Sequence, residues 1–244
     1  MDIVLPLLIG FAAGFIGALA SGGGLISIPA LIFLGMSPQA SIATTRLSAL
    51  TGSLTSIFKF RRAGIINMKY VFPFLASAIL GGLVGSKLLL EIDENLLEKT
   101  LGFILLFFAP ILVFNKDFGL AEKNKGKHHK IIGFFVIFII MIYAAMFGGG
   151  GGTFLIYALV YFYGMSIIQA NANGTTMGIF ANLTALIAYW SSGLIDFRIG
   201  IPLMIGSAVG GYLGAHTAIK KGNEAVKWIF LTIVLISGIK LIFF

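Results

Sequence analysis

The chain has 244 residues, of which 58% are hydrophobic and 11% charged, and its mean hydropathy is +1.02. Such a composition cannot present a charged surface to water on all sides, so it excludes an ordinary soluble domain and indicates an integral membrane protein. The sequence contains no cysteine, which excludes a disulfide framework, a CxxC redox centre and thiolate metal sites. The net charge of +8 arises from Lys and Arg residues that flank apolar segments, which favours cytoplasmic loops over nucleic-acid binding.

The apolar residues form long continuous segments, not an alternating pattern. Met68–Leu90, Leu101–Asn115 and Ile131–Phe147 are examples. Segments of this kind favour membrane-spanning helices over the strands of a barrel. The chain has room for roughly seven to eight segments of about 20 residues. We therefore predict an all-α integral membrane protein.

The stretch Ser21–Pro29 interrupts the first apolar segment with three consecutive glycines. Glycine weakens helix continuity because it lacks a Cβ atom, so we predict a chain reversal after Ala20 and a new short helix over Leu25–Leu34. The N–H groups at the start of such a helix favour anions, and irregular backbone is tolerated at membrane depth where it lines a cavity. A second glycine run, Gly148–Gly152, predicts a second broken hairpin.

Each half of the chain is predicted to hold a broken re-entrant hairpin followed by three transmembrane helices. The first half comprises residues 1–114, with its hairpin and helices at Asp2–Leu34, Gln39–Phe60, Lys69–Leu90 and Leu96–Phe114. A basic cytoplasmic linker follows at residues 115–130. The second half comprises residues 131–244, with the corresponding elements at Ile131–Phe162, Ile167–Trp190, Arg198–Ile219 and Ala225–Phe244.

The two halves align without a gap when the sequence is shifted against itself. Gly35 falls on Gly164, which lies 129 positions later, and the same shift places Pro73 on Pro202. Membrane sequences share Gly and Leu by composition alone, but this explanation accounts poorly for an ungapped run of rarer matches. We therefore predict a duplication into two similar halves.

The Lys and Arg residues predict the orientation of the chain, because short loops rich in them stay cytoplasmic. They form three clusters, namely Lys59, Arg61, Arg62 and Lys69, then Lys116, Lys123, Lys125, Lys127 and Lys130, and finally Lys220, Lys221 and Lys227. With a re-entrant hairpin at the second glycine run, the loops near Arg62 and Ser192 fall on opposite faces. The halves are then inverted repeats and both termini are extracytoplasmic, a pattern typical of transporters with a site near the midplane.

The helix after each hairpin contains the most polar membrane sequence, at Ser41–Ser48 and Gln169–Thr176. The shift superposes these two segments, so we expect both to face a substrate between the glycine breaks. The predicted substrate-binding residues are Gly22, Gly23, Gly24, Thr44, Thr45, Arg46, Ser48, Gly150, Gly151, Gly152, Asn171, Asn173, Thr175 and Thr176. The alternative is that their polar side chains only form hydrogen bonds between helices.

Arg46 lies two turns into its helix, and no Asp or Glu lies in the predicted membrane core to pair with it. Burying an unpaired guanidinium is costly, so the substrate itself is the candidate counter-charge. The planar fork of Arg matches carboxylate, sulfonate or sulfite oxygens, which favours an anionic substrate. The alternative is that Arg46 extends to the outer interface. The lack of core carboxylates argues against an Asp or Glu proton relay. Coupling to a proton, through the substrate or a histidine, coupling to sodium and the absence of coupling all stay open.

At these residues the chain resembles the sulfite exporter TauE/SafE family. The resemblance covers nearly the whole sequence and rests on Gly22–Pro29, on Ala40–Ser48, and on the second glycine break followed by Asn171–Thr176. Pro29 has no counterpart in the second half, where Ala158 stands. The resemblance implies a bacterial inner-membrane permease for a small anion, with a sulfur oxyanion or sulfonate as the first choice. Spacing alone indicates only an anion.

The sequence therefore predicts a secondary transporter that binds a sulfur oxyanion or organosulfonate, such as sulfite or sulfoacetate, at the midplane, with alternating access by rocking of the halves. An anion channel of the same architecture and a carboxylate transporter are the alternatives. An enzyme is disfavoured because the predicted core holds no paired carboxylates and no nucleophile with a base. The expected partners are a small anion and the lipid bilayer, without nucleic acid, metal or cofactor, and the oligomeric state stays open.

Overall fold

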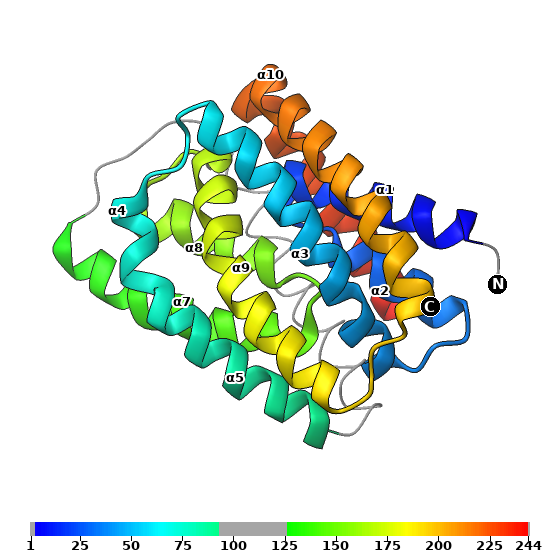
Figure 1. The fold of residues 1–244 in the computed structure, drawn as a ribbon. Coiled ribbons are helices and arrows are strands. Elements are labelled where there is room, and N and C mark those ends of the chain that lie inside the picture. The colour runs from blue at the N-terminus through cyan, green and yellow to red at the C-terminus, as the bar shows by residue number, and fades with distance from the viewer. Residues whose placement is uncertain (1–2, 93–125, 244) are drawn as a thin grey trace.

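The computed structural model describes residues 3–92 and 126–243, and these ranges contain helices and no strand. The elements in chain order (Figure 1) are α1 Val4–Ala20, α2 Gly24–Phe33, α3 Pro38–Arg62, α4 Met68–Val71, the 3-10 helix η1 Phe72–Phe74, α5 Leu75–Glu91, α7 Lys127–Phe147, α8 Gly151–Tyr163, α9 Ile167–Ser191 and α10 Phe197–Phe243. The predicted all-α class is confirmed for this part of the chain. The predicted helix Leu96–Phe114 and most of the predicted linker lie outside the described residues.

Both glycine runs separate two helices. α1 ends at Ala20, after which Ser21 adopts left-handed backbone with φ 51°, and α2 begins at Gly24. In the second run, α7 ends before Gly148 and α8 begins after Gly150, and these two glycines have φ angles of 69° and 78°. Glycine adopts such angles at little cost, which explains why the chain can reverse here.

The helices that follow the two broken hairpins, α3 and α9, begin at serine caps. The Ser37 side chain accepts a hydrogen bond from the backbone of Ala40, with Pro38 in the first helical position of α3. Ser166 and Gln169 form a reciprocal capping box at the start of α9. These caps satisfy N–H groups that a helix start leaves unpaired. They fix where the two most polar helices of the chain begin.

One of the predicted helices after the hairpins is interrupted in the structure, and two others agree with it. The segment Lys69–Leu90 is divided at Pro73 into α4, η1 and α5, because proline lacks the N–H group that a continuous helix needs. The predicted helices Arg198–Ile219 and Ala225–Phe244 correspond to the two parts of α10, which are separated at Gly222, where φ 78° and ψ 177° are not helical.

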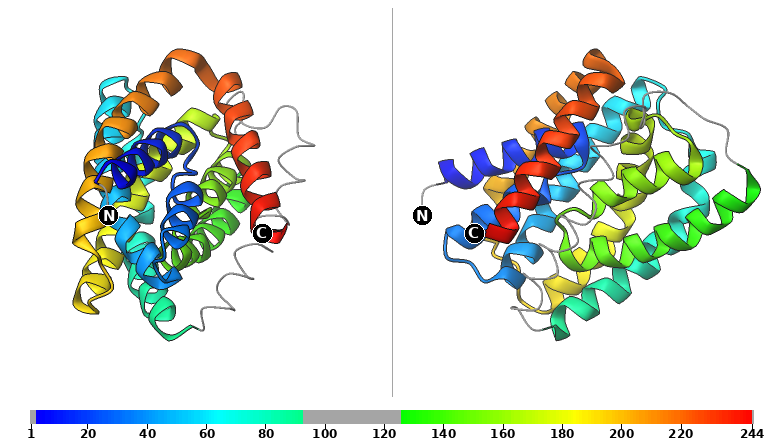
Figure 2. Two further views of the ribbon diagram at one scale, coloured as in Figure 1. Left: turned by 90° about the vertical axis from the view of Figure 1, so that its right-hand side faces the viewer. Right: turned by 180° about the vertical axis from the view of Figure 1, so that it is seen from behind.

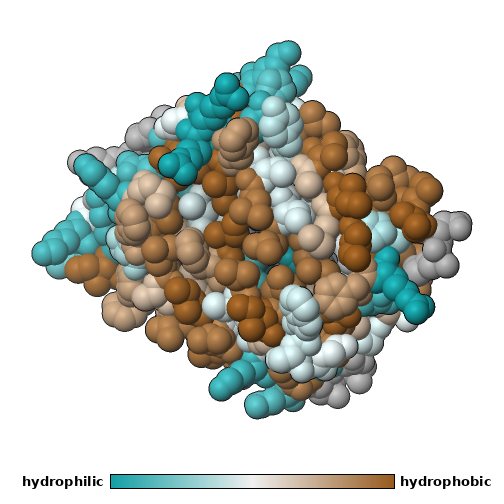
Figure 3. All heavy atoms as spheres, in the orientation of Figure 1, coloured by the Kyte–Doolittle hydropathy of each residue, from teal (hydrophilic) through white to brown (hydrophobic). Residues whose placement is uncertain are grey.

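The residues of α5 are distributed inside out relative to those of a soluble helix. Its buried residues are mostly small, namely Ser77, Ala78, Gly81, Gly82, Gly85 and Ser86. Its exposed residues are large and apolar, among them Ile79, Leu80, Leu83, Val84 and Leu88. Figure 3 shows hydrophobic residues over most of one face of the molecule, with the hydrophilic ones toward its margins. This distribution suits a lipid surrounding, where small residues allow helices to pack closely.

Three described segments are long and apolar enough to cross a membrane, at Met68–Glu91, Lys127–Phe147 and Phe197–Ile229. The chain bends by 120° between α8 and α9, and a fourth span is counted if these two helices form one bent span. α1 and α2 are shorter apolar helices, and α3 has the length of a span but is too polar. The apolar helices support an integral membrane protein.

The described helices form two groups that lie side by side in Figure 1. α1, α2 and α3 pack with α10 in one group, and α5, α7, α8 and α9 pack together in the other. The two arms of α10 pass on opposite sides of α1 (Figure 2). Each group therefore takes its hairpin from one half of the sequence and a long helix from the other half.

Glycines bring α1 and α10 into close contact. Cβ atoms built on Gly206, Gly210 and Gly214 would lie 2.0, 2.1 and 2.3 Å from the carbonyl oxygens of Leu7, Phe11 and Phe15. Any side chain on these three glycines would therefore push the helices apart. Their packing sets the position of α1, and with it the position of the first glycine break.

Several features recur at the spacing found in the sequence. α3 spans Pro38–Arg62 and α9 spans Ile167–Ser191, so both helices have 25 residues and equivalent ends. The glycines that precede and follow them have positive φ angles in both halves, at Gly35 and Gly164 and again at Gly64 and Gly193. α3 and α9 run in opposite directions through the molecule (Figure 1).

Candidate functional site

The two glycine breaks touch each other. A Cβ atom on Gly24 would lie 2.6 Å from the carbonyl oxygen of Gly148, and one on Gly152 would lie 2.7 Å from Cβ of Ser21. Both glycines are therefore required by the close approach of the backbones. As a result, the ends of α1 and α7 and the starts of α2 and α8 come together at one place.

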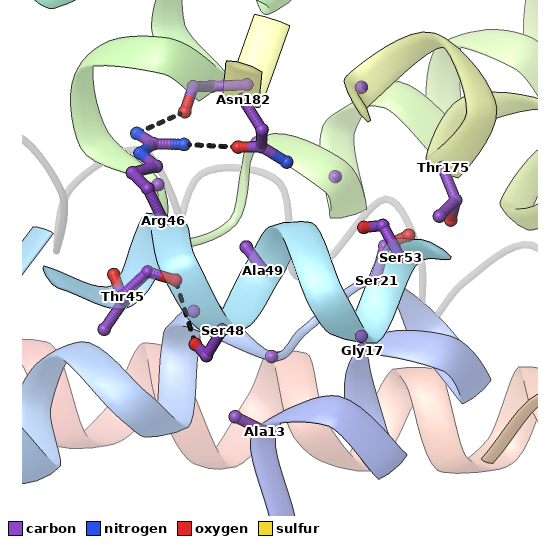
Figure 4. A pocket seen from close by; sticks show the side chains of 18 of the residues that line it. Ala13, Gly17, Ser21, Thr45, Arg46, Ser48, Ala49, Ser53, Thr175 and Asn182 are labelled. Carbon is purple, nitrogen blue, oxygen red and sulfur yellow. Dashed lines mark hydrogen bonds between the residues drawn. The ribbon is translucent and has the colours of Figure 1, made fainter. Parts of the chain in front are cut away.

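A cavity of about 150 Å³ lies beside this contact (Figure 4). Its walls come from α1, α2, α3 and α10 on one side and from α7, α8 and α9 on the other, so it lies between the two helix groups. Hydroxyl groups and an amide give it polar character, from Ser21, Ser27, Thr45, Ser48, Ser53, Ser56, Thr175, Asn182 and Ser207. No carboxylate among the described residues lines it.

Arg46 of α3 lines the cavity, and the structure exposes only 4% of this residue. Its Nη1 donates to Oδ1 of Asn182 at 2.9 Å. Its Nη2 donates to the carbonyl oxygen of Ala144 at 3.0 Å and to that of Ala145. The Tyr189 ring centroid lies 5.9 Å from Cζ of the guanidinium, and the Tyr189 hydroxyl donates to the same Ala145 carbonyl at 2.8 Å.

The guanidinium is balanced only in part by these contacts. Ala144 and Ala145 belong to the last turn of α7, which is the negative end of that helix dipole. Nε of Arg46 is buried without a hydrogen-bond partner among the described residues. The site therefore presents a buried positive charge that helix dipoles solvate and that no described carboxylate lining the cavity neutralises.

Asn171 of α9 connects that helix to the first break. Its Nδ2 donates to the carbonyl oxygen of Ala18, near the end of α1. Its Oδ1 accepts from the Ser21 hydroxyl at 2.7 Å and from the Thr175 hydroxyl at 3.3 Å. These contacts satisfy a carbonyl at the end of α1 and hold Ser21 in its left-handed conformation.

Thr44 and Asn173 make equivalent contacts in the two halves. The Thr44 hydroxyl oxygen accepts from the backbone N–H of Asp196 at 3.0 Å, and Oδ1 of Asn173 accepts from that of Asn67 at 2.9 Å. Asn67 directly precedes α4 and Asp196 directly precedes α10, and the two residues are equivalent in the repeat. Each of these polar residues therefore holds a loop from the other half.

The structure brings together part of the predicted site. The predicted residues that line the cavity are Gly23, Gly24, Thr45, Arg46, Ser48, Gly151, Gly152 and Thr175. Those that the cavity lining does not include are Gly22, Thr44, Gly150, Asn171, Asn173 and Thr176. The Thr176 hydroxyl donates to the Ala172 carbonyl within its own helix at 2.8 Å. Substrate binding by any of these residues stays a prediction.

The predicted site omitted several residues that line the cavity or hold Arg46. Asn182 and Ser53 line it from α9 and α3, Ser207 lines it from α10, and Tyr189 contacts the guanidinium. A signal was present for two of them, because the 129-residue shift superposes Ser53 on Asn182. For Ser207 and Tyr189 we find no such signal, because the same shift places them on Ala78 and Phe60, which are apolar.

Comparison with known proteins gives a consistent match. A family model described as "Sulfite exporter TauE/SafE" matches residues 6–241. A probable membrane transporter protein of Haemophilus influenzae is 29% identical over 232 residues, which cover 93% of this chain and 91% of the relative. The probable membrane transporter protein YfcA of Escherichia coli K12 is 24% identical, over 99% of this chain and 92% of its own. No solved structure matches. The named relatives and the apolar helices support a multi-pass membrane protein related to transporters.

Proposed function

Because the chain belongs to the sulfite exporter TauE/SafE family, we propose that it is a secondary transporter of a small anion in the bacterial inner membrane. The family description names sulfite, and the proposed substrate class is a sulfur oxyanion or an organosulfonate, such as sulfite or sulfoacetate. The observation that carries the anionic substrate is Arg46, whose buried charge lines the cavity without a carboxylate from the described residues. A bound anion supplies the missing counter-charge.

The site is built from inverted repeats, and the anion is bound near the membrane midplane. The opposite directions of α3 and α9 support this arrangement (Figure 1), as do the positive φ angles that recur in both halves. The first residues of α2 and α8, Gly24 and Gly151, line the same cavity, and the N-terminal end of a helix favours an anion. Discontinuous helices that present these ends to an anion are typical of transporters.

Alternating access follows from the position of the cavity between the two helix groups. Movement of the α1, α2, α3 and α10 group against the α5, α7, α8 and α9 group opens the cavity to one side of the membrane at a time. This differs from rocking of the two sequence halves, because each group contains helices from both halves.

The test is flux of radiolabelled sulfite and sulfonates into liposomes that contain the purified protein. A carrier gives saturable uptake that is stimulated by unlabelled anion on the opposite side. An anion channel gives flux that stays linear with concentration and shows no such stimulation. Acetate and other simple carboxylates, tested in parallel, distinguish a carboxylate transporter. If the protein transports none of these anions, the proposed function is wrong.

Arg46→Gln and Arg61→Gln form a matched pair for this assay. Both substitutions remove one positive charge, but Arg61 is exposed and does not line the cavity. Arg46→Gln should abolish saturable uptake, whereas Arg61→Gln should retain it. Equal uptake by the two variants would remove Arg46 from the binding site.

A further inference from the structure

Four helix ends meet at the cavity, two of each polarity. The C-terminal ends of α1 and α7 contribute Ala18 and Ala144 to its walls, and the N-terminal starts of α2 and α8 contribute Gly24 and Gly151. Each N-terminal end carries about half a positive elementary charge, and each C-terminal end about half a negative one. Because the ends are present in equal numbers, their charges cancel to first order.

Arg46 is the only charged side chain among the described residues that line the cavity. The carboxylates in the described part of the chain are Glu91, Asp196 and Glu224, and none of them lines the cavity. The guanidinium also keeps an unused hydrogen-bond donor, because its buried Nε has no partner among the described residues. The cavity therefore carries a net charge of about +1.

We infer that the cavity selects monovalent over divalent anions. A monovalent anion neutralises the charge of Arg46, whereas a divalent anion leaves about one uncompensated negative charge at a site removed from water. The cost of removing an ion from water also rises steeply with its charge. This inference rests on the proposed anion transport and narrows its substrate class, since it ranks monovalent sulfonates above divalent ones such as sulfoacetate.

The position equivalent to Arg46 in the other half is Thr175, which also lines the cavity. The Asn182 that contacts Arg46 is likewise equivalent to Ser53, on the opposite wall. The repeat thus provides a second position in the same cavity where a basic side chain could lie, but this position holds the neutral Thr175. A basic residue there would raise the net charge of the cavity to about +2.

Equilibrium binding to the purified full-length protein tests the inference with two pairs of anions. Methanesulfonate and sulfate have similar size but one and two negative charges, and the same holds for isethionate and sulfoacetate. The wild-type protein should bind the monovalent member of each pair at least about tenfold more tightly. Equal or tighter binding of sulfate and sulfoacetate would overturn the charge selection and leave the proposed transport intact. Binding of none of the four anions would overturn both.

Variants with an added charge test the same point in the opposite direction. Thr175→Arg and Ser53→Lys should each shift the preference toward the divalent member of both pairs. Ser191→Arg is the matched control, because it adds a charge on α9 at an exposed residue outside the cavity, and it should retain the wild-type preference. A folded Thr175→Arg or Ser53→Lys variant with unchanged preference would overturn the inference, and the wild-type comparison decides it if neither variant folds.

Discussion

Arg46 and Asn171 perform related tasks at the two breaks. Arg46, on α3, donates hydrogen bonds to the last turn of α7, and Asn171, on α9, donates one to the Ala18 carbonyl near the end of α1. Each break is therefore capped from the helix that follows the other hairpin. Such capping satisfies carbonyl groups that an interrupted helix would otherwise leave unpaired inside the membrane.

Substitution of Asn171 should destabilise the first break. Asn171→Ala removes the hydrogen bonds to the Ala18 carbonyl and to the Ser21 hydroxyl, and a buried polar group left unpaired costs about 1–3 kcal/mol. We expect a lower unfolding temperature in detergent. The control is Ser191→Ala, which removes a hydroxyl that bonds only to its own helix at an exposed residue. Equal unfolding temperatures for the two variants would show that the Asn171 contacts add no stability.

The sequence was sufficient to identify Arg46 and Asn171 as candidate site residues, but it was not sufficient to predict their hydrogen-bond partners. A lone Arg and clustered Asn residues in apolar segments mark polar positions inside the membrane. Their partners lie far along the chain, since Arg46 is 98 residues from Ala144 and Asn171 is 153 residues from Ala18. The sequence pattern therefore could not separate residues that line the cavity from those that cap a break or hold a loop.

At the scale of the helix, glycines determine both the breaks and the closest packing. Runs of glycine were sufficient to predict where α1 and α7 end, because consecutive glycines oppose helix continuation. Single glycines were less informative. Gly222 bends α10 with a positive φ angle, whereas Gly210 lies in a straight part of the same helix and serves only to admit α1. Local sequence does not distinguish these two uses, because the difference depends on a neighbouring helix.

Gly210→Ala should separate α10 from α1. The added methyl group would lie 2.1 Å from the backbone carbonyl oxygen of Phe11, and backbone cannot move aside as a flexible side chain can. Overpacking of this kind costs about 1–3 kcal/mol, so the unfolding temperature in detergent should fall. Gly178→Ala is the matched control within a helix, because a Cβ there meets nothing within 4 Å. It should be neutral or slightly stabilising, and a larger loss for Gly178→Ala than for Gly210→Ala would contradict this account of the packing.

At the scale of the whole molecule, each helix group on either side of the cavity contains helices from both halves of the sequence. α10, from the second half, packs against α3 of the first half. α5, from the first half, packs against α9 of the second half. Each half therefore contributes one helix to the group that contains the other half's hairpin. The loops held by Thr44 and Asn173 make the same exchange. In the proposed alternating access, each hairpin would keep the helices that cap and position it.

The inverted arrangement predicts that equivalent loops label from opposite sides of the membrane. Arg62 and Ser192 lie directly at the ends of α3 and α9, and both are exposed. α3 and α9 run in opposite directions (Figure 1), so these ends should emerge at opposite faces. Arg62 belongs to a basic cluster, so the positive-inside rule predicts that its end of α3 faces the cytoplasm.

The measurement is labelling of Arg62→Cys and Ser192→Cys with a membrane-impermeant maleimide, in intact cells and in inverted vesicles. The natural sequence has no cysteine, so the unmodified protein is a background-free control. Ser192→Cys should label in intact cells, and Arg62→Cys only in inverted vesicles. Labelling of both from the same face would show that the halves are parallel, and the N-terminal ends of α2 and α8 could then no longer approach one anion from opposite sides of the membrane.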